Sequence, residues 1–160
     1  INFVKLQSFS FIIGDVLMIK ISSYELRKCD KIQKLIFESK LINEDELQRF
    51  ERDLIDRFGV LPTQVVDLLD SVRIKWLATT LGFEKVVMKN HKLVGYFISD
   101  QESRFYQSIH FSKVLQYVQA HPQSCVVKEK QMRVGLRLLM SFSNINSVQQ
   151  GLQALKPILL

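Results

Sequence analysis

Two adjacent helical patterns joined by a tight turn, between Asn43 and Gly82, most constrain how this chain can fold. In each pattern apolar residues recur every three or four positions, which is the spacing of one face of an α-helix. The first pattern consists of Leu47, Phe50, Leu54, Ile55 and Phe58, and the second of Val65, Leu68, Leu69, Val72, Trp76, Leu77 and Leu81. The stretch therefore predicts two helices packed as a helical hairpin.

Residues at the ends of the two patterns are those that begin and end helices. Asn43 is suited to cap the first helix, with Glu46 in the position from which a capping-box acid reaches back. Gly59 can take the left-handed conformation that ends a helix, and Pro62 suits the first turn of the next. Gly82 closes the second helix.

Charged residues follow the first helix beside its apolar stripe. Asp45–Arg49 and Asp53–Arg57 are acid-before-base pairs four residues apart, the favourable order on a helix surface. The charged ridge of this helix consists of Arg49, Asp53, Asp56 and Arg57. Taken alone, this ridge is explained as an ordinary solvated helix face.

The rest of the chain predicts an α+β fold: an N-terminal helical hairpin region followed by a small, mostly antiparallel sheet with two helices. A capping-box pattern at Ser22–Glu25 opens an additional helix to about Lys40. The later elements are strands at Phe83–Met88, Leu93–Ile98, Val126–Lys130 and Met132–Met140, a helix at Ser108–Ala120, and a last helix capped by Asn146 and ended near Pro157.

The chain reads as a single domain over 1–160, with a lead-in segment at 1–21, a helical half at 22–82 and a mixed half at 83–160. The lead-in is apolar, but Lys5, Asp15 and Lys20 interrupt it, which disfavours a signal peptide or a membrane span. It is expected to form one or two buried strands or to pack along a neighbouring domain. Because the sequence begins with Ile1 and not with a methionine, we expect a fragment of a longer multidomain protein.

Composition favours a folded protein with a modest basic excess. Apolar residues make up 47% of the chain, and the formal net charge is +6 without a run of like charges. Such an excess permits contact with nucleic acid or an acidic partner without requiring either. Cys29 and Cys125 lie far apart, so neither a disulfide framework nor a zinc site is indicated, and a cytoplasmic location is expected.

Motifs for catalysis or cofactor binding are absent from the sequence. No glycine arrangement matches a phosphate-binding loop, and no G-x-S-x-G elbow is present. His91, His110 and His121 share no metal-ligand spacing. We therefore expect no catalytic, cofactor-binding or metal-binding residue, and no enzyme activity in this chain.

Aromatic and basic residues in the predicted strands have simple structural explanations. Trp76, Phe83, Tyr96 and Phe97 are expected in the core rather than in a base-stacking platform. Arg133 and Arg137 would share one face of a strand, where a solvated sheet surface explains them better than phosphate contacts do.

The stretch Glu51–Pro62, with its core L-I-D-R-F-G-x-L-P, resembles the C-terminal domain of the bacterial transcription-repair coupling factor, Mfd. Phe11–Leu17 and Phe105–Ser108 fit the same pattern more weakly. The resemblance implies a regulatory clamp without catalytic function, which packs on a UvrB-like N-terminal module and masks its UvrA-binding surface until RNA polymerase is engaged. It also implies that ATP, Mg²⁺ and DNA are bound by a motor upstream in the parent protein.

The resemblance places the contacts of this clamp on Asp53, Asp56 and Arg57, with Arg49 beside them on the ridge. No membrane partner is implied. Two alternatives stay open: a basic nucleic-acid-binding accessory module, which would show a steep salt dependence of binding, and a small enzyme, which would show a cleft lined by strongly perturbed acids or bases.

Overall fold

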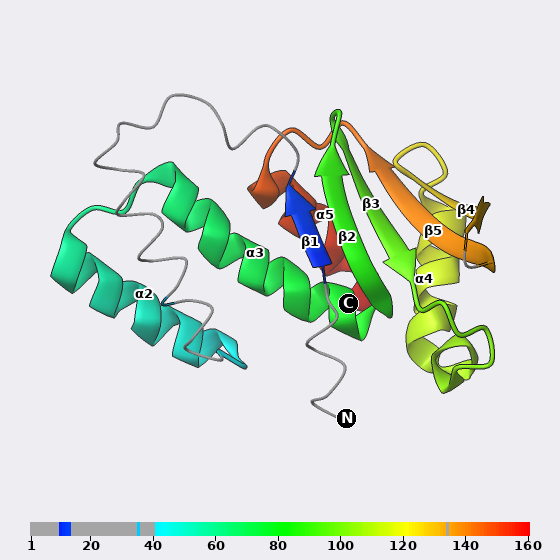
Figure 1. The fold of residues 1–160 in the computed structure, drawn as a ribbon, viewed down its shortest axis with the longest axis horizontal. Coiled ribbons are helices and arrows are strands. Elements are labelled where there is room, and N and C mark those ends of the chain that lie inside the picture. Colours follow the sequence, from blue (N-terminus) through cyan, green and yellow to red (C-terminus); the bar gives the residue numbers. More distant parts are fainter. Residues whose placement is uncertain (1–9, 14–34, 36–40, 134) are drawn as a thin grey trace.

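The structure, a computed structural model, describes residues 10–13, 35, 41–133 and 135–160 (Figure 1). Apart from Leu35, the predicted helix at 22–40 therefore lies outside the described residues, as does most of the lead-in at 1–21. Within them the chain has the predicted α+β fold. The helices are α2 (Glu44–Phe58), α3 (Thr63–Thr80), α4 (Ile109–Ala120) and α5 (Val148–Leu159), with a short 3-10 helix η3 (Arg104–Gln107).

The strands form one five-stranded sheet in the order β1-β2-β3-β5-β4. They are β1 (Ser10–Ile13), β2 (Phe83–Lys89), β3 (Lys92–Phe97), β4 (Cys125–Met132) and β5 (Gly135–Ser143). Every pairing is antiparallel except that of β1 with β2, which is parallel. Ser10–Ile13 of the lead-in thus form a strand, as one of the two expectations for the lead-in proposed.

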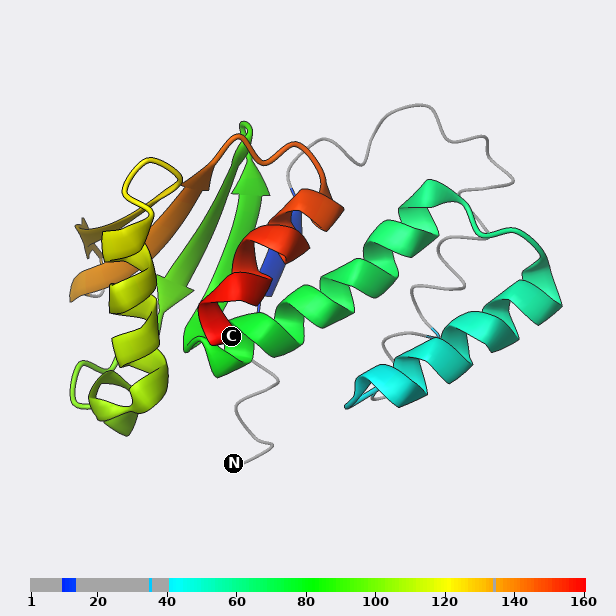
Figure 2. The same ribbon diagram turned by 180° about the vertical axis from the view of Figure 1, so that it is seen from behind.

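Helices α3, α4 and α5 all lie on one side of the sheet, as the view from behind shows (Figure 2). The main core fills the space between these two layers. Its fully buried members include Ile74 and Ala78 from α3, Phe97 from β3, Met140 from β5 and Leu155 from α5. The strands contribute every second residue to this core, because side chains along a strand alternate between the two faces of the sheet.

Helix α3 connects the two halves of the molecule. Its C-terminal half packs on the sheet through Ile74 and Ala78, and its N-terminal half holds Val65 against Leu54 of α2. Figure 1 accordingly shows α2 on the side of α3 away from the sheet. The outer surface of α2 therefore lies at one end of the molecule.

Polar residues define the β2–β3 turn and the start of α4. Asn90 and His91 both have positive φ, 53° and 57°, which gives the tight hairpin turn between β2 and β3. Ser108 caps α4 by accepting a hydrogen bond from the Phe111 N–H. The hairpin and the helix at 108–120 are therefore confirmed.

Three predictions near the C-terminal end were wrong in detail. Met132 ends β4 rather than starting the next strand, so Arg133 lies in the turn and does not share a strand face with Arg137. Ser147, not Asn146, caps α5 by accepting from the Gln150 N–H. Pro157 lies inside α5, which continues to Leu159.

Candidate interdomain interface on α2

Helix α2 begins and ends where its sequence signals predict. The Asn43 side chain accepts a hydrogen bond from the Glu46 N–H at 2.9 Å, and the Glu46 carboxylate accepts from the Ile42 N–H at 3.1 Å. The reciprocal capping contact thus reaches Ile42, one residue before the expected Asn43. Gly59 ends the helix with φ 75°, and its N–H donates to the Ile55 carbonyl at 2.8 Å.

One side of α2 packs against α3. Leu47 and Leu54 are buried, and Phe50 and Phe58 are partly buried around the contact between Leu54 and Val65. Ile55, which the stripe predicted to be apolar core, is instead 47% exposed. Ile55 lies about 100° around the helix from the buried Leu54, on the flank of the packed side near Glu51.

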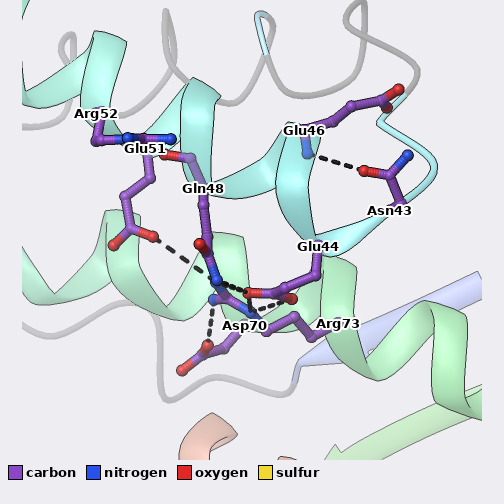
Figure 3. Close-up of polar contacts among 8 residues, drawn as sticks. All are labelled: Asn43, Glu44, Glu46, Gln48, Glu51, Arg52, Asp70 and Arg73. Atoms are coloured by element: carbon purple, nitrogen blue, oxygen red, sulfur yellow. Dashed lines mark hydrogen bonds and ion pairs between the residues drawn. The ribbon is translucent and has the colours of Figure 1, made fainter.

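Arg73 of α3 ties the two helices together through a cluster of acids (Figure 3). Its guanidinium donates to both carboxylate oxygens of Glu44, with Nη2–Oε1 at 2.7 Å and Nε–Oε2 at 3.0 Å. Nη1 also donates to Asp70 Oδ1 at 2.8 Å, and Nη2 lies 3.7 Å from Glu51 Oε2. Gln48 completes the cluster by donating to Glu44 at 3.3 Å.

The charges in this cluster stabilise one another. The hydrogen bond from Arg73 lowers the pKa of the Glu44 carboxyl, against the raising effect of burial. The same hydrogen bond raises the pKa of the Arg73 guanidinium. Bidentate arginine–carboxylate pairing of this kind is among the stronger polar contacts in proteins. The cluster therefore fixes how α2 lies against α3.

The charged ridge lies on the exposed part of α2. Arg49, Asp53, Asp56 and Arg57 are all exposed. At 100° per residue, Arg49 and Asp56 face away from Leu47 and Leu54, and Asp53 and Arg57 extend the ridge around one flank of the helix. The structure thus brings all four predicted residues together on one outward surface at the end of the molecule.

The ion pairs predicted along this ridge do not form. Among the residues that the structure describes, the ion pairs within 4.0 Å involve Arg73 and Arg137, and none joins Asp45 to Arg49 or Asp53 to Arg57. The reason is that each long side chain loses rotamer freedom when fixed at a solvated surface, which offsets the weak attraction. The ridge charges consequently have no ion-pair partner within the described part of the chain.

Sequence reasoning missed the Arg73 cluster. Asp70 and Arg73 are three residues apart on α3, a spacing that could have indicated a pair. Glu44 is separated from Arg73 by 29 residues, so only the packing of α2 on α3 brings them together.

Other parts of the described chain offer little for chemistry. No group of three or more His, Cys, Asp or Glu in the described residues is placed to hold a metal ion. A shallow hollow is lined by Ile98, Gln101, Tyr106, Glu129, Leu136 and Leu138. Burial raises the pKa of the Cys125 thiol, which makes it a poor nucleophile at neutral pH. Of the helices that the structure describes, none has the length and apolar character needed to span a bilayer.

Comparison with known proteins identifies a protein family that this chain matches. Residues 37–108 match the model of the TRCF domain, a segment that contains α2, α3 and the charged ridge. Relatives named transcription-repair-coupling factor include that of Rickettsia prowazekii, 32% identical over 119 residues, and that of Borreliella burgdorferi, 27% identical over 130 residues. These alignments cover 74% and 80% of this chain, but it spans only about a tenth of each relative's length, 10% and 11%.

A solved structure supports the same fold. It is described as the crystal structure of the C-terminal domain of transcription-repair coupling factor, with a TM-score of 0.52 and 16% sequence identity. The superposition covers 95% of this chain and 92% of that one. Sequence and fold agree: this chain belongs to the family of transcription-repair-coupling factor C-terminal domains, with its TRCF domain at residues 37–108.

Proposed function

We propose that this chain is the regulatory, non-catalytic C-terminal domain of a coupling factor and works as an autoinhibitory clamp. In this proposal it packs on the UvrB-like N-terminal module of the parent protein through Asp53, Asp56 and Arg57, with Arg49 beside them. The clamp masks the UvrA-binding surface of that module until RNA polymerase is engaged. ATP, Mg²⁺ and DNA are handled by the motor upstream, in the cytoplasm, and this chain needs no cofactor.

The observation that carries the proposal is the division of charge on α2. Glu44 and Glu51 are engaged by Arg73 within the fold, whereas the ridge charges point outward and have no ion-pair partner in the described part of the chain. A rigid helix that holds unpaired charges of both signs on one outward face is suited to a polar inter-domain contact. Charge pairs across such a contact set its register and exclude wrong partners, while adding limited net affinity.

Limited affinity fits a clamp that has to open. A partner shifts a closed–open equilibrium only by the difference in its affinity for the two states. An interface dominated by a few charge pairs keeps the closure energy within a few kcal/mol, which a bound polymerase can overcome.

The test measures binding of this chain to the separately produced UvrB-like module by titration calorimetry. Replacing Asp53, Asp56 and Arg57 together by Ala should weaken binding by at least about tenfold, which corresponds to about 1.4 kcal/mol. The intact chain should also lower the affinity of the module for UvrA, and the triple variant should not.

A matched control removes the same charges elsewhere. Asp100, Glu102 and Arg104 are exposed near η3, away from α2, and their triple replacement by Ala should leave module binding unchanged (Figure 1). Thermal melts check that both variants stay folded. Equal binding by the intact chain and the Asp53/Asp56/Arg57 variant would mean that the ridge is only a solvated helix face.

A further inference from the structure

The sheet has one covered and one uncovered face. Helices α3, α4 and α5 occupy one side, and no helix or strand that the structure describes lies on the other (Figures 1 and 2). Burial follows this division along the strands. On β3, Leu93, Gly95 and Phe97 are buried toward the helices, whereas Val94 and Tyr96 between them are only partly buried.

Every basic residue of strands β2 to β5 lies on the uncovered face. The six are Lys85 and Lys89 on β2, Lys92 on β3, Lys128 and Lys130 on β4, and Arg137 on β5. Their strand partners and the alternation of the pleat place them together, opposite to the buried positions. The uncovered face therefore concentrates positive charge that is dispersed in the sequence.

Little negative charge balances this face. Among the residues of these four strands the only acids are Glu84 and Glu129. Glu84 is already engaged in an ion pair with Arg137. Glu129 pairs with Leu138 and lines the hollow on the side of the helices. Five lysines consequently remain on the face without an acid from its own strands.

Two cross-strand pairs on this face place like charges directly opposite each other. Lys89 is paired with Lys92 at the end of the β2–β3 hairpin, and Lys130 is paired with Arg137. Such pairs destabilise an antiparallel sheet. Lysines on an edge strand also prevent aggregation, and this accounts for Lys128 and Lys130 because β4 is an edge strand. That explanation does not apply to Lys85, Lys92 or Arg137, because β2, β3 and β5 lie inside the sheet.

An aromatic residue lies in the middle of the same face. Tyr96 is partly exposed and is paired with Lys85 on one side and Leu139 on the other. The Lys85 Nζ lies 5.7 Å from the centre of the Tyr96 ring. The pairing continues from Leu139 to Lys128, so one row across four strands, about 14 Å wide, has a lysine at each end and the tyrosine between them.

We propose that this uncovered face binds single-stranded nucleic acid. The lysines at the two sides of the row would contact phosphates, and the Tyr96 ring would stack on a base. A positively charged surface combined with an exposed aromatic ring is how proteins bind single strands without reading their sequence. An acidic protein segment would use the lysines but would not need a flat aromatic ring at the centre. This surface is separate from the ridge on α2 and does not depend on the clamp.

The test measures fluorescence anisotropy of a labelled oligothymidine of about 12 nucleotides, titrated with the 160-residue chain at several salt concentrations. Replacing Lys89, Lys92, Lys128 and Lys130 together by Gln should weaken binding at least about tenfold at low salt. It should also reduce the slope of log affinity against log salt by about 3, since each lost phosphate contact on a single strand removes about 0.7.

Two further variants test whether a loss of affinity is specific to this face or follows from the lower net charge alone. Replacing Arg52, Lys75, Arg104 and Lys156 by Gln also lowers the net charge from +6 to +2, but on helices away from the sheet face, and should change affinity less than about twofold. Tyr96→Leu should weaken binding several-fold without changing the salt slope, because stacking releases no counterions.

Three results would overturn the proposal. They are equal losses in the two quadruple variants, the absence of oligonucleotide binding by the intact chain, and binding of polyglutamate that is lost only in the sheet-face variant. The last result would assign the face to an acidic protein partner instead. Thermal melts of all variants exclude unfolding as the cause of any loss.

Discussion

At the scale of single residues, Gly59 fixes where α2 ends. Its φ is 75° and its ψ is −153°, whereas the left-handed cap expected from the sequence has ψ near +47°. The positive φ is thus confirmed, but the residue lies in a region that only glycine enters readily. This conformation turns the chain from α2 to Pro62 within three residues, and so orients the ridge relative to α3.

Gly59→Ala should therefore destabilise the protein by about 1–3 kcal/mol. A Cβ at this position would meet no atom within 4 Å, so the cost comes from the backbone alone. Urea unfolding would measure the free energy of unfolding. The control is Val60→Ala, because Val60 is 92% exposed and its truncation should change little. Similar unfolding midpoints for the two variants would show that the cap is not strained.

At the scale of elements, the hairpin of α2 and α3 is held both by apolar packing and by Arg73. The apolar contact alone permits some rotation of α2, since small clusters of side chains repack easily. Fork-like hydrogen bonds from Arg73 to Glu44 have a fixed geometry, so they select one orientation. This contact therefore sets the direction in which the charged ridge of α2 faces.

Glu44→Gln should lower stability at neutral pH by roughly 0.5–1 kcal/mol, a value kept small because the Glu44 side chain is about half exposed. The folded-state pKa of Glu44 is lowered, so its contribution is fully present above the unfolded pKa and is lost as the pH falls through the folded pKa. The difference between wild type and variant should therefore shrink at acidic pH. Urea unfolding across a pH series checks this.

Asp45→Asn is the matched control for that experiment. Asp45 also lies in the first turn of α2, so both variants lose a similar interaction with the helix dipole. Asp45 forms no ion pair within the described chain. A pH dependence of equal size in both variants would contradict a specific role for the Arg73 contact.

At the scale of the whole molecule, the described residues form two apolar clusters of unequal size. The main core joins the sheet to α3, α4 and α5, and α5 alone buries Val148, Leu152, Leu155 and Ile158 in it. The smaller cluster centres on Leu54 and Val65. Because local stability follows the burial of apolar side chains, α2 should open more readily than the sheet and its helices.

Hydrogen exchange followed by mass spectrometry should show this order. Backbone amides of α2 should exchange faster than those of α5, and those of the central strand β3 should exchange slowest. Ile55→Ala serves as a control that should not alter exchange in α5, because Ile55 is half exposed and lies outside the main core. Exchange of α2 and α5 in one concerted step would show that the two clusters unfold as a unit.

Much of this fold was determined locally by the sequence. The hairpin of α2 and α3 follows from periodic apolar residues and from the capping groups of Asn43 and Gly59, all of which act within a few residues. The β2–β3 hairpin and α4 follow in the same way. The exposed positions of Asp53, Asp56 and Arg57 were also predictable, because they lie off the apolar stripe of a single helix.

Only the tertiary structure decided which residues from distant segments meet. The contact of Arg73 with Glu44 depends on how α2 packs on α3, and the parallel pairing of β1 with β2 brings together residues about 75 positions apart. Tyr96 was predicted in the core, yet it lies on the uncovered face, because the described helices α3, α4 and α5 all cover the other side of the sheet. Strand register likewise gathers six scattered basic residues there, since side chains two positions apart share a face and only pairing aligns neighbouring strands.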